Sequence, residues 1–226
     1  MATLLLLCGS RGQAQQAATP QTYTFEKGEI FDILLLTKKP DTDSLFKDYV
    51  KVIFPMAIEL SFETLRGFGI KDNLRGNYEA GAMILGKWRD LQLREQFLTK
   101  VEKEHPDFHD RRRAIWSTFD LTYYELPERT QFTVDRQRYN VITALWPDKK
   151  GKFKKYFRQW RQLVEQSGGQ LIFALSGGKS PYGYHYQPEQ FVMVSWADAA
   201  SYAAFAKRVD ALDRGGVLHI NEMALR

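Results

Sequence analysis

Hydrophobic and polar positions along the first half of the chain predict a β-α-β-β-α-β unit. Residues 30–37 are dense in β-branched and aliphatic residues, which predicts a strand. Apolar residues at helical spacing then predict a helix that Asp43 or Ser44 caps, and we expect Pro55 to kink or interrupt it. Strands follow over residues 63–71, 78–88 and 117–126. Between the second and third of these strands, Asp90 caps a helix that ends at residues 105–107. Residues 72–77 are interpreted as a loop between strands.

The second half repeats the same order after a polar linker over residues 127–130. Strands are predicted over residues 138–146, 170–175, 191–196 and 217–225, and helices over residues 153–164 and 198–213. Four residues recur at one constant spacing: Trp88 as Trp196, Asp90 as Asp198, Phe97 as Phe205, and Val101 as Val209. The predicted class is therefore α+β, with ferredoxin-like repeats over residues 23–126 and 131–226.

The duplication has a physical reason, because a four-stranded sheet with helices on one face leaves its other face bare. The predicted strands over residues 117–126 and 138–146 carry bulky side chains on both faces. We therefore expect the two repeats to cover each other and form a pseudo-dimeric α/β barrel.

The net charge of the chain says little about which classes of partner it binds. The 226 residues carry a formal net charge of +5, from 32 basic and 27 acidic residues, which permits anionic partners without demanding them. The basic clusters at residues 111–113 and 149–161 are interpreted as solvated faces. Residues 66–70 match the start of an RNA-recognition signature, but Lys71 and Asn73 break it, so we expect no nucleic-acid partner.

The first 22 residues predict a signal peptide and a disordered lead-in. Four leucines at residues 4–7 precede small residues that suit cleavage after Ala14, so we expect an exported protein, periplasmic or secreted. A cationic start is missing, and acylation of Cys8, the only cysteine, is an open alternative. Cleavage would leave no cysteine, which excludes thiol chemistry. No later segment is apolar enough to predict a membrane span.

The Trp-x-Asp junction between a strand and a helix, with an aromatic residue seven positions after the Asp, is similar to a pattern of the dimeric α/β-barrel superfamily. The resemblance covers residues 30–225. It implies paired ferredoxin-like units, and activities such as quinol-type or heme-degrading monooxygenases, muconolactone isomerases and dye-decolouring peroxidases. Further pairing into a homo-dimer is left open.

Heme-degrading members of that superfamily use an Asn on the first strand, with a Trp and a His on the following helix. Asn140 matches the strand position, whereas Phe97 and Phe205 occupy the helical position of the Trp. Neither helix has a His at the right interval. The resemblance therefore does not carry heme chemistry to this chain, and the residues identify no cofactor.

Two groups of candidate site residues emerge. Asp32 and Asn140 are interpreted as repeat equivalents in apolar strands, and either make structural hydrogen bonds or line a pocket with Trp88 and Trp196, where Asp32 would act as a general base. The second group is an aromatic loop that either binds a ligand or covers the edge of the core. Its members are Tyr182, Tyr184, His185 and Tyr186.

His105 and His109 have the spacing of helical metal ligands, but Pro106 interrupts the helix, so we predict no metal site. Two functions stay open: a small-molecule pocket, with or without enzymatic activity, and a non-catalytic structural or protein-interaction module. A cavity of roughly 300 Å³ with convergent polar groups would favour the first. A filled barrel would favour the second.

Overall fold

The structure of the chain is a computed structural model, which describes residues 20–181 and 185–226. Its elements follow the predicted order twice, and the α+β class with tandem ferredoxin-like repeats is confirmed. The first repeat comprises β2 (Ile30–Lys38), α1 (Asp43–Glu59), β3 (Glu63–Arg75), β4 (Ala82–Trp88), α2 (Leu91–Glu104), α3 (Phe108–Ile115) and β5 (Trp116–Glu125). The second comprises β7 (Tyr139–Pro147), α4 (Lys150–Gln166), β8 (Gln170–Ser176), β9 (Gln190–Trp196), α5 (Ala199–Asp210) and β10 (Val217–Leu225).

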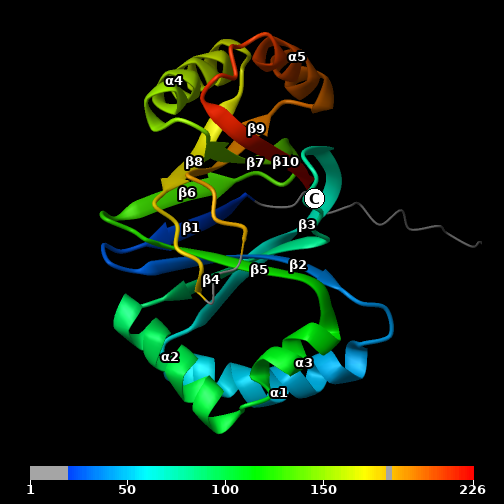
Figure 1. Cartoon of the computed structure of the whole chain (residues 1–226), viewed down its shortest axis with the longest axis vertical. Coiled ribbons are helices and arrows are strands. Elements are labelled where there is room, and N and C mark those ends of the chain that lie inside the picture. The colour runs from blue at the N-terminus through cyan, green and yellow to red at the C-terminus, as the bar shows by residue number, and fades with distance from the viewer. Residues whose placement is uncertain (1–19, 182–184) are drawn as a thin grey trace, which may run out of the picture.

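One large antiparallel sheet contains strands of both repeats, in the order β5-β2-β4-β3-β10-β7-β9-β8. Within each repeat the last strand lies beside the first, and the third lies between the first and the second. The repeats join where β3 pairs with β10. Figure 1 shows the result: α1, α2 and α3 lie at one end of the molecule, α4 and α5 at the other, and the strands lie between them.

A second contact brings β5 to the segment that follows β8. Tyr123 and Lys179 exchange both backbone N–H···O bonds, at 2.8 and 2.9 Å. The Thr122 hydroxyl also donates to the Tyr186 carbonyl. Gly178 permits this approach, because a Cβ atom there would lie 2.7 Å from side-chain atoms of Thr122 and Tyr124. The barrel is therefore joined by the β3–β10 ladder on one side and, among the described residues, by the Tyr123–Lys179 bridge on the other.

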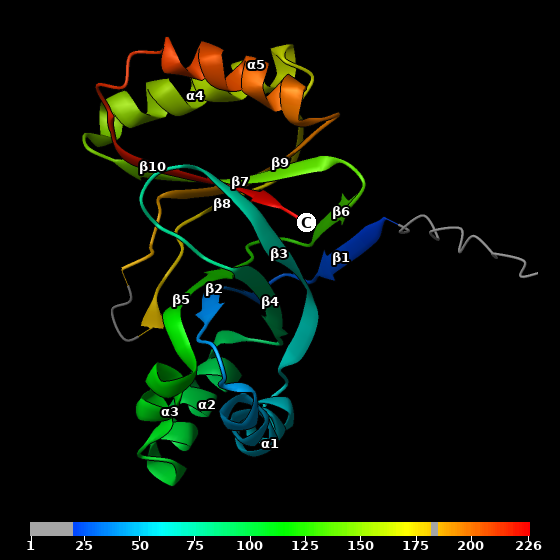
Figure 2. The ribbon, with the colours of Figure 1, turned by 90° about the vertical axis from the view of Figure 1, so that its right-hand side faces the viewer.

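The barrel interior is packed with side chains from both repeats, as the duplication argument predicted. Phe31 of the first repeat contacts Phe173 of the second, with ring centroids 6.1 Å apart. Separate apolar clusters lie in the two spaces between the sheet and its covering helices, and Figure 2 shows these two helical layers on opposite sides of the strands. The chain thus has a shared core and two outer layers.

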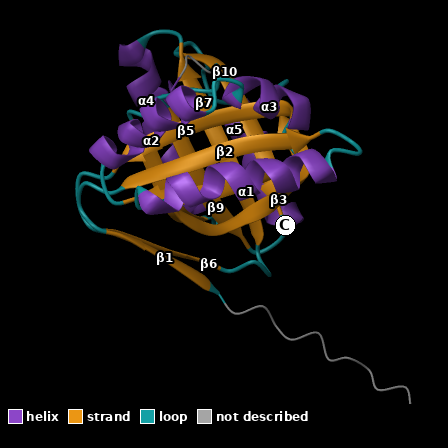
Figure 3. Cartoon of the chain, turned by 90° about the horizontal axis from the view of Figure 1, so that it is seen from below, coloured by secondary structure: helices purple, strands orange, loops and turns teal. Residues whose placement is uncertain are grey.

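A two-stranded ribbon was not predicted. β1 (Gln21–Phe25) pairs with β6 (Thr130–Val134), and the ribbon lies beside the large sheet in Figure 3. The interpretation of residues 127–130 as a linker is wrong at Thr130, which begins β6. Both strands have only five residues, of which alternate ones are buried. Strands this short carry a weak pattern in the sequence.

Several boundaries also differ from the predictions. The N-cap of α1 is Thr42, where Asp43 or Ser44 was predicted, because the helix already begins at Asp43. The helix continues through Pro55, which is exposed, so the carbonyl that lacks a helical partner can bond to water. β3 extends to Arg75 through residues predicted as a loop, and α3 is an unpredicted helix of the first repeat. The caps of α2 and α5 are as predicted: Asp90 and Asp198 each accept a backbone N–H bond at 2.8 Å. Among the described residues, no helix is long and apolar enough to cross a membrane.

Candidate functional site

A cavity of about 270 Å³ lies between the sheet and the helices of the first repeat. Its walls come from α1, α2, α3 and all four strands of the repeat, in the lower half of Figure 1. Most lining side chains are aliphatic or aromatic, which suits an organic ligand. The lining residues are Asp32, Leu34, Leu36, Phe46, Tyr49, Ile53, Phe54, Ala57, Phe62, Thr64, Ile84, Trp88, Phe97, Arg112, Trp116, Phe119 and Leu121.

Asp32 is the acidic group of this cavity and is only 3% exposed. One carboxylate oxygen accepts a hydrogen bond from Trp88 Nε1 at 2.9 Å, and the other accepts one from Arg94 Nε at 2.7 Å. Arg94 is 1% exposed, and its guanidinium carbon lies 3.8 Å from the centre of the Tyr123 ring. Because a carboxylate oxygen has two lone pairs, both oxygens of Asp32 retain capacity to accept another bond.

Arg112 supplies a second buried cation, at another part of the wall. Its Nε donates to the Tyr49 hydroxyl at 3.0 Å. Its guanidinium carbon lies 3.9 Å from the centre of the Phe108 ring and 4.3 Å from that of Phe119. The two rings hold the guanidinium in place, so the cavity has an acceptor and a cation at fixed positions.

The predicted equivalence of Asp32 and Asn140 is wrong. Asp32 pairs with Gly86, two residues before the Trp that ends β4. Two residues before the Trp that ends β9 is Val194, and its partner is Val141. Val141 is therefore the equivalent of Asp32. An offset of one residue turns a strand side chain to the other face, so Asn140 lies on the barrel side of its sheet.

Asn140 makes structural hydrogen bonds in that position. It is 2% exposed, and its amide nitrogen donates to the carbonyls of Asp135 at 2.8 Å and Arg138 at 3.2 Å. These bonds hold the turn that leads from β6 into β7. The structure therefore separates Asn140 from Asp32 and supports the structural alternative for Asn140.

Trp196 likewise belongs to a packed layer. Its ring lies 4.7 Å from Phe205 and 6.0 Å from Tyr202, between the sheet and α5. Here the second repeat has bulky residues where the first has small or polar ones. Val141, Val194 and Leu171 occupy the register positions of Asp32, Gly86 and Thr64. Aliphatic side chains thus pack this part of the layer in the second repeat, whereas Asp32 and Thr64 line a cavity in the first.

The described residues of the aromatic loop lie outside this cavity. Tyr182 and Tyr184 are outside the described residues, His185 is exposed, and Tyr186 is buried. Tyr186 donates to Asn221 Oδ1 at 2.9 Å, and burial raises the pKa of its hydroxyl well above the usual value. Its ring centre lies 4.5 Å from that of Tyr78, beside a second cavity of about 250 Å³. His185 and Tyr186, the two described members of this group, therefore do not line the cavity that contains Asp32.

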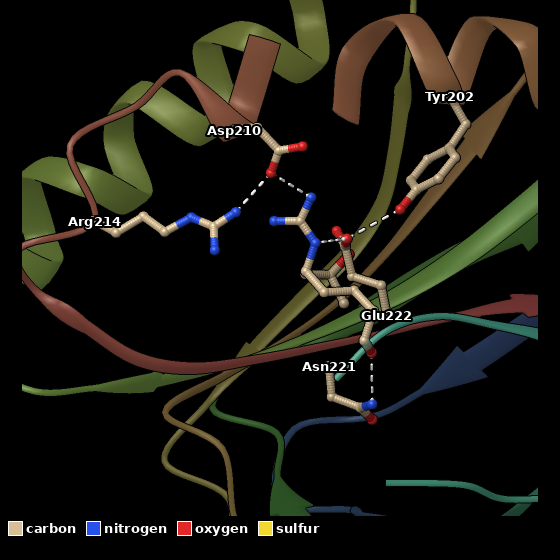
Figure 4. A network of polar contacts seen from close by, with 7 residues as sticks. Tyr202, Asp210, Arg214, Asn221 and Glu222 are labelled. Carbon is tan, nitrogen blue, oxygen red and sulfur yellow. Dashed lines mark hydrogen bonds and ion pairs between the residues drawn. The ribbon is translucent and has the colours of Figure 1, made fainter. Parts of the chain in front are cut away.

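A partly buried network of polar contacts joins the two repeats at the β3–β10 seam (Figure 4). Glu222 pairs with Arg75 Nε at 3.0 Å and accepts hydrogen bonds from Tyr202 at 2.9 Å and Thr143 at 3.2 Å. Arg75 also pairs with Asp210 at 2.8 Å. Burial raises the pKa of Glu222, and Arg75 opposes that shift. Arg75 belongs to the first repeat, whereas Glu222 and Asp210 belong to the second. The network therefore links the two repeats.

The residues do not fit the heme pattern of the resemblance. Asn140 lies on the barrel side of its sheet and is engaged with backbone carbonyls, whereas Phe205 lies on the helix side against Trp160 and Trp196. His109 contacts Glu102 at 3.1 Å. The described part of the chain contains no group of three or more side chains able to ligate a metal.

Sequence reasoning missed Arg94 and Arg112. The prediction of a solvated face for residues 111–113 is wrong at Arg112, which is 7% exposed. A signal was present in both cases, because each arginine occupies the buried stripe of its helix. Arg94 precedes Phe97 by three residues, and Arg112 lies four after Phe108. An arginine at such a position must find a buried partner.

The comparisons identify the fold. No protein-family model and no curated protein matches the sequence. Chlorite dismutase from Candidatus Nitrospira defluvii, in complex with imidazole, superposes with a TM-score of 0.52 at 9% identity, covering 89% of this chain and 92% of that one. A mutant of that enzyme gives 0.51 at 9% identity, over 89% and 93%. An anthrone oxidase-like protein gives 0.49 at 16% identity, over 91% and 94%. The chain has the fold of the dimeric α/β-barrel superfamily, with both ferredoxin-like units in one polypeptide.

Proposed function

We propose that the chain binds a small organic molecule of one or two aromatic rings in the cavity of the first repeat. The observation that carries this proposal is the cavity itself, with its aromatic and aliphatic lining and the buried Asp32 carboxylate in its wall. An apolar cavity of about 150 Å³ holds one benzene molecule. A cavity of about 270 Å³ is accordingly large enough for a ring system with polar substituents.

The contrast between the repeats supports a binding role. A layer filled by Val141, Val194 and Leu171 shows that this fold packs well without the Asp32–Arg94 pair. Replacing a buried ion pair by apolar residues is often neutral or stabilising, so the pair brings no evident gain in stability. Its place beside a cavity supports a role in recognising a ligand.

The packing of the second repeat favours a structural role for that repeat. Its helix–sheet layer and the barrel interior are filled with side chains, which is the feature expected of a structural module. We propose that the second repeat serves mainly to complete the barrel, and that ligand chemistry belongs to the first. Whether the ligand also reacts is a separate proposal, in which Asp32 is the group placed to exchange a proton with it.

A thermal-shift screen of one- and two-ring aromatic compounds tests the binding proposal. A ligand at 100 times its dissociation constant should stabilise the protein by about 2.7 kcal/mol. The shift should be smaller in Thr64→Leu, whose longer side chain should occupy part of the cavity. No shift with any compound, or an equal shift in Thr64→Leu, would contradict the proposal.

Export and a homo-dimer are proposals as well. The leucine run at residues 4–7 and the small residues before the expected cleavage site support export. A signal peptide would leave Cys8 out of the mature chain.

A further inference from the structure

The second cavity, of about 250 Å³, lies where β7 ends and β10 begins, next to the loop between β3 and β4. None of the described residues in its lining belongs to the lining of the first-repeat cavity. Its wall carries the rings of Tyr78, Trp146, Tyr186 and His219. Leu218 also lines it and is 72% exposed, so the cavity opens to solvent. It is therefore a separate candidate site with a different lining.

The rings of this wall contact one another in a bent row. The centre of the Tyr186 ring lies 4.5 Å from that of Tyr78 and 5.1 Å from that of Trp146. The Trp146 ring in turn lies 5.1 Å from the ring of His219. Successive ring planes are inclined to each other by 50°, 90° and 53°, so their faces point in different directions. A flat ring system could stack on only one of these faces, whereas a compact, rounded group can contact several.

One buried asparagine holds two of the rings in place. Asn221 is 1% exposed, and its Oδ1 accepts the hydrogen bond from the Tyr186 hydroxyl at 2.9 Å. Its Nδ2 donates to the Tyr78 carbonyl at 3.2 Å and to the Arg75 carbonyl at 2.9 Å. The wall is therefore ordered before a ligand arrives, which lowers the entropic cost of binding.

Charge decides which class of ligand this wall suits. The Tyr78 hydroxyl donates to Asp120 Oδ2 at 2.6 Å. The face of an aromatic ring carries partial negative charge, and a hydrogen bond from the phenol to an acidic group adds to it. None of the described residues that line the cavity is a lysine or an arginine. An anion would find no fixed positive charge there, whereas a cation would meet electron-rich ring faces.

We propose that this cavity binds a quaternary ammonium ion, with the methyl groups of the cation against the rings of Tyr78, Trp146 and Tyr186. Such ions are compact and rounded and have no N–H group to donate, so ring faces are the contacts that suit them. A cavity of about 250 Å³ has room for a cation of the size of choline, since an apolar cavity of about 150 Å³ holds benzene. The proposal goes beyond the binding function of the first repeat and does not depend on it.

Titration of the full chain with choline and with 3,3-dimethylbutan-1-ol tests the proposal. The two compounds have the same shape, but in the second a neutral carbon atom replaces the charged nitrogen. Nuclear magnetic resonance measures both affinities through the methyl proton signal of each compound. Choline should bind about tenfold or more tightly than the neutral compound, because only the cation is attracted to the ring faces by its charge. Equal affinities, or no binding of choline, would overturn the proposal.

Variants test the location of the cation. Trp146→Leu keeps an apolar side chain but removes a ring face, so it should weaken choline about tenfold and the neutral compound less than about threefold. Asp120→Asn removes the nearby negative charge and should weaken choline about threefold or more, without an effect on the neutral compound. Asp110→Asn removes a negative charge on α3, outside the cavity lining, and is the matched control that should change neither affinity.

The same variants can also contradict the proposal. An equal loss for both compounds in Trp146→Leu would indicate an apolar contact alone, and unchanged choline binding in that variant would place the cation elsewhere. If Trp146→Leu does not fold, as circular dichroism would show, the comparison of the two compounds and the Asp120→Asn variant still decide the outcome.

Discussion

Asp32 and Gly86 face each other across β2 and β4, at the register position where Val141 and Val194 face each other in the second repeat. The pair of valines fills the space below its helices. At Gly86 the Phe62 ring takes the space of a side chain, because a Cβ atom there would lie 2.4 Å from it. Asp32 and Phe62 line the cavity of the first repeat, whereas aliphatic side chains pack the corresponding layer of the second.

Thr64 pairs with Gly86, and Leu171 holds the equivalent position in the second repeat. The variant Thr64→Leu therefore gives the first repeat the residue of the second at this position. The added methyl groups should occupy part of the cavity and lower the affinity for aromatic ligands about tenfold or more, by steric exclusion. The free energy of unfolding should change little, since Thr64 lies at an exposed edge. Titration of this variant beside Thr64→Ser, which should bind as the wild type does, checks the prediction. Equal affinity in both variants would place the ligand elsewhere.

Replacement of Arg94 should lower the free energy of unfolding. Arg94→Met leaves the buried Asp32 carboxylate without its cation, and loss of one partner of a buried pair costs about 3–5 kcal/mol. The double variant Asp32→Val with Arg94→Leu removes both charges and should recover most of that loss. Urea unfolding measures both changes, and Lys100→Met, which breaks the exposed pair with Glu59, should show no measurable change. A double variant as unstable as the single one would show that the pair itself stabilises the fold.

Glu222 should make stability depend on pH. Burial raises its pKa in the folded protein above the ordinary value of 4.5, so the folded state binds a proton more tightly than the unfolded state does. The contribution of Glu222 is therefore fully present below pH 4.5 and is lost as the pH rises through the folded pKa. The free energy of unfolding of the wild type, minus that of Glu222→Gln, should fall as the pH rises from 4.5. A difference that rises over this range would contradict the assignment.

The absence of a side chain at Gly178 should be needed for the Tyr123–Lys179 bridge between the two repeats. Gly178→Ala would press a methyl group into Thr122 and Tyr124, with a cost of about 1–3 kcal/mol. Hydrogen exchange at the Tyr123 and Lys179 amides should become faster, because their two bonds form the bridge. Gly151→Ala, in the open first turn of α4, is the control and should be neutral or stabilising by up to about 1 kcal/mol. Unchanged exchange in Gly178→Ala would contradict the role of this contact.

Export predicts a defined mature end. Expression of the whole sequence in a bacterium should yield a periplasmic or secreted protein that begins at Gln15. Mass spectrometry of the intact protein checks this, with an Ala14→Lys variant as the control that blocks cleavage. A cytoplasmic protein of full length would contradict the prediction.

The sequence predicted the elements that repeat. Asp90 and Asp198 cap their helices, and Trp88 and Trp196 end the third strand of each unit, because local patterns determine these features. The one-residue offset that separates Asn140 from Asp32 could not be read from composition, since both strands are apolar and register depends on strand pairing. Arg94 and Arg112 were readable as polar residues on apolar helix stripes. Their partners come from distant elements, and only the folded chain identifies them.

A crystal structure of the chain soaked with an aromatic compound that gives a thermal shift is the decisive measurement for the cavity of the first repeat. We expect electron density for the ligand between α1 and the β2–β4 pair, in contact with Trp88 and Ile84. Density at the second cavity beside Tyr78 and Tyr186, or an empty first-repeat cavity in crystals that bind the ligand, would contradict it.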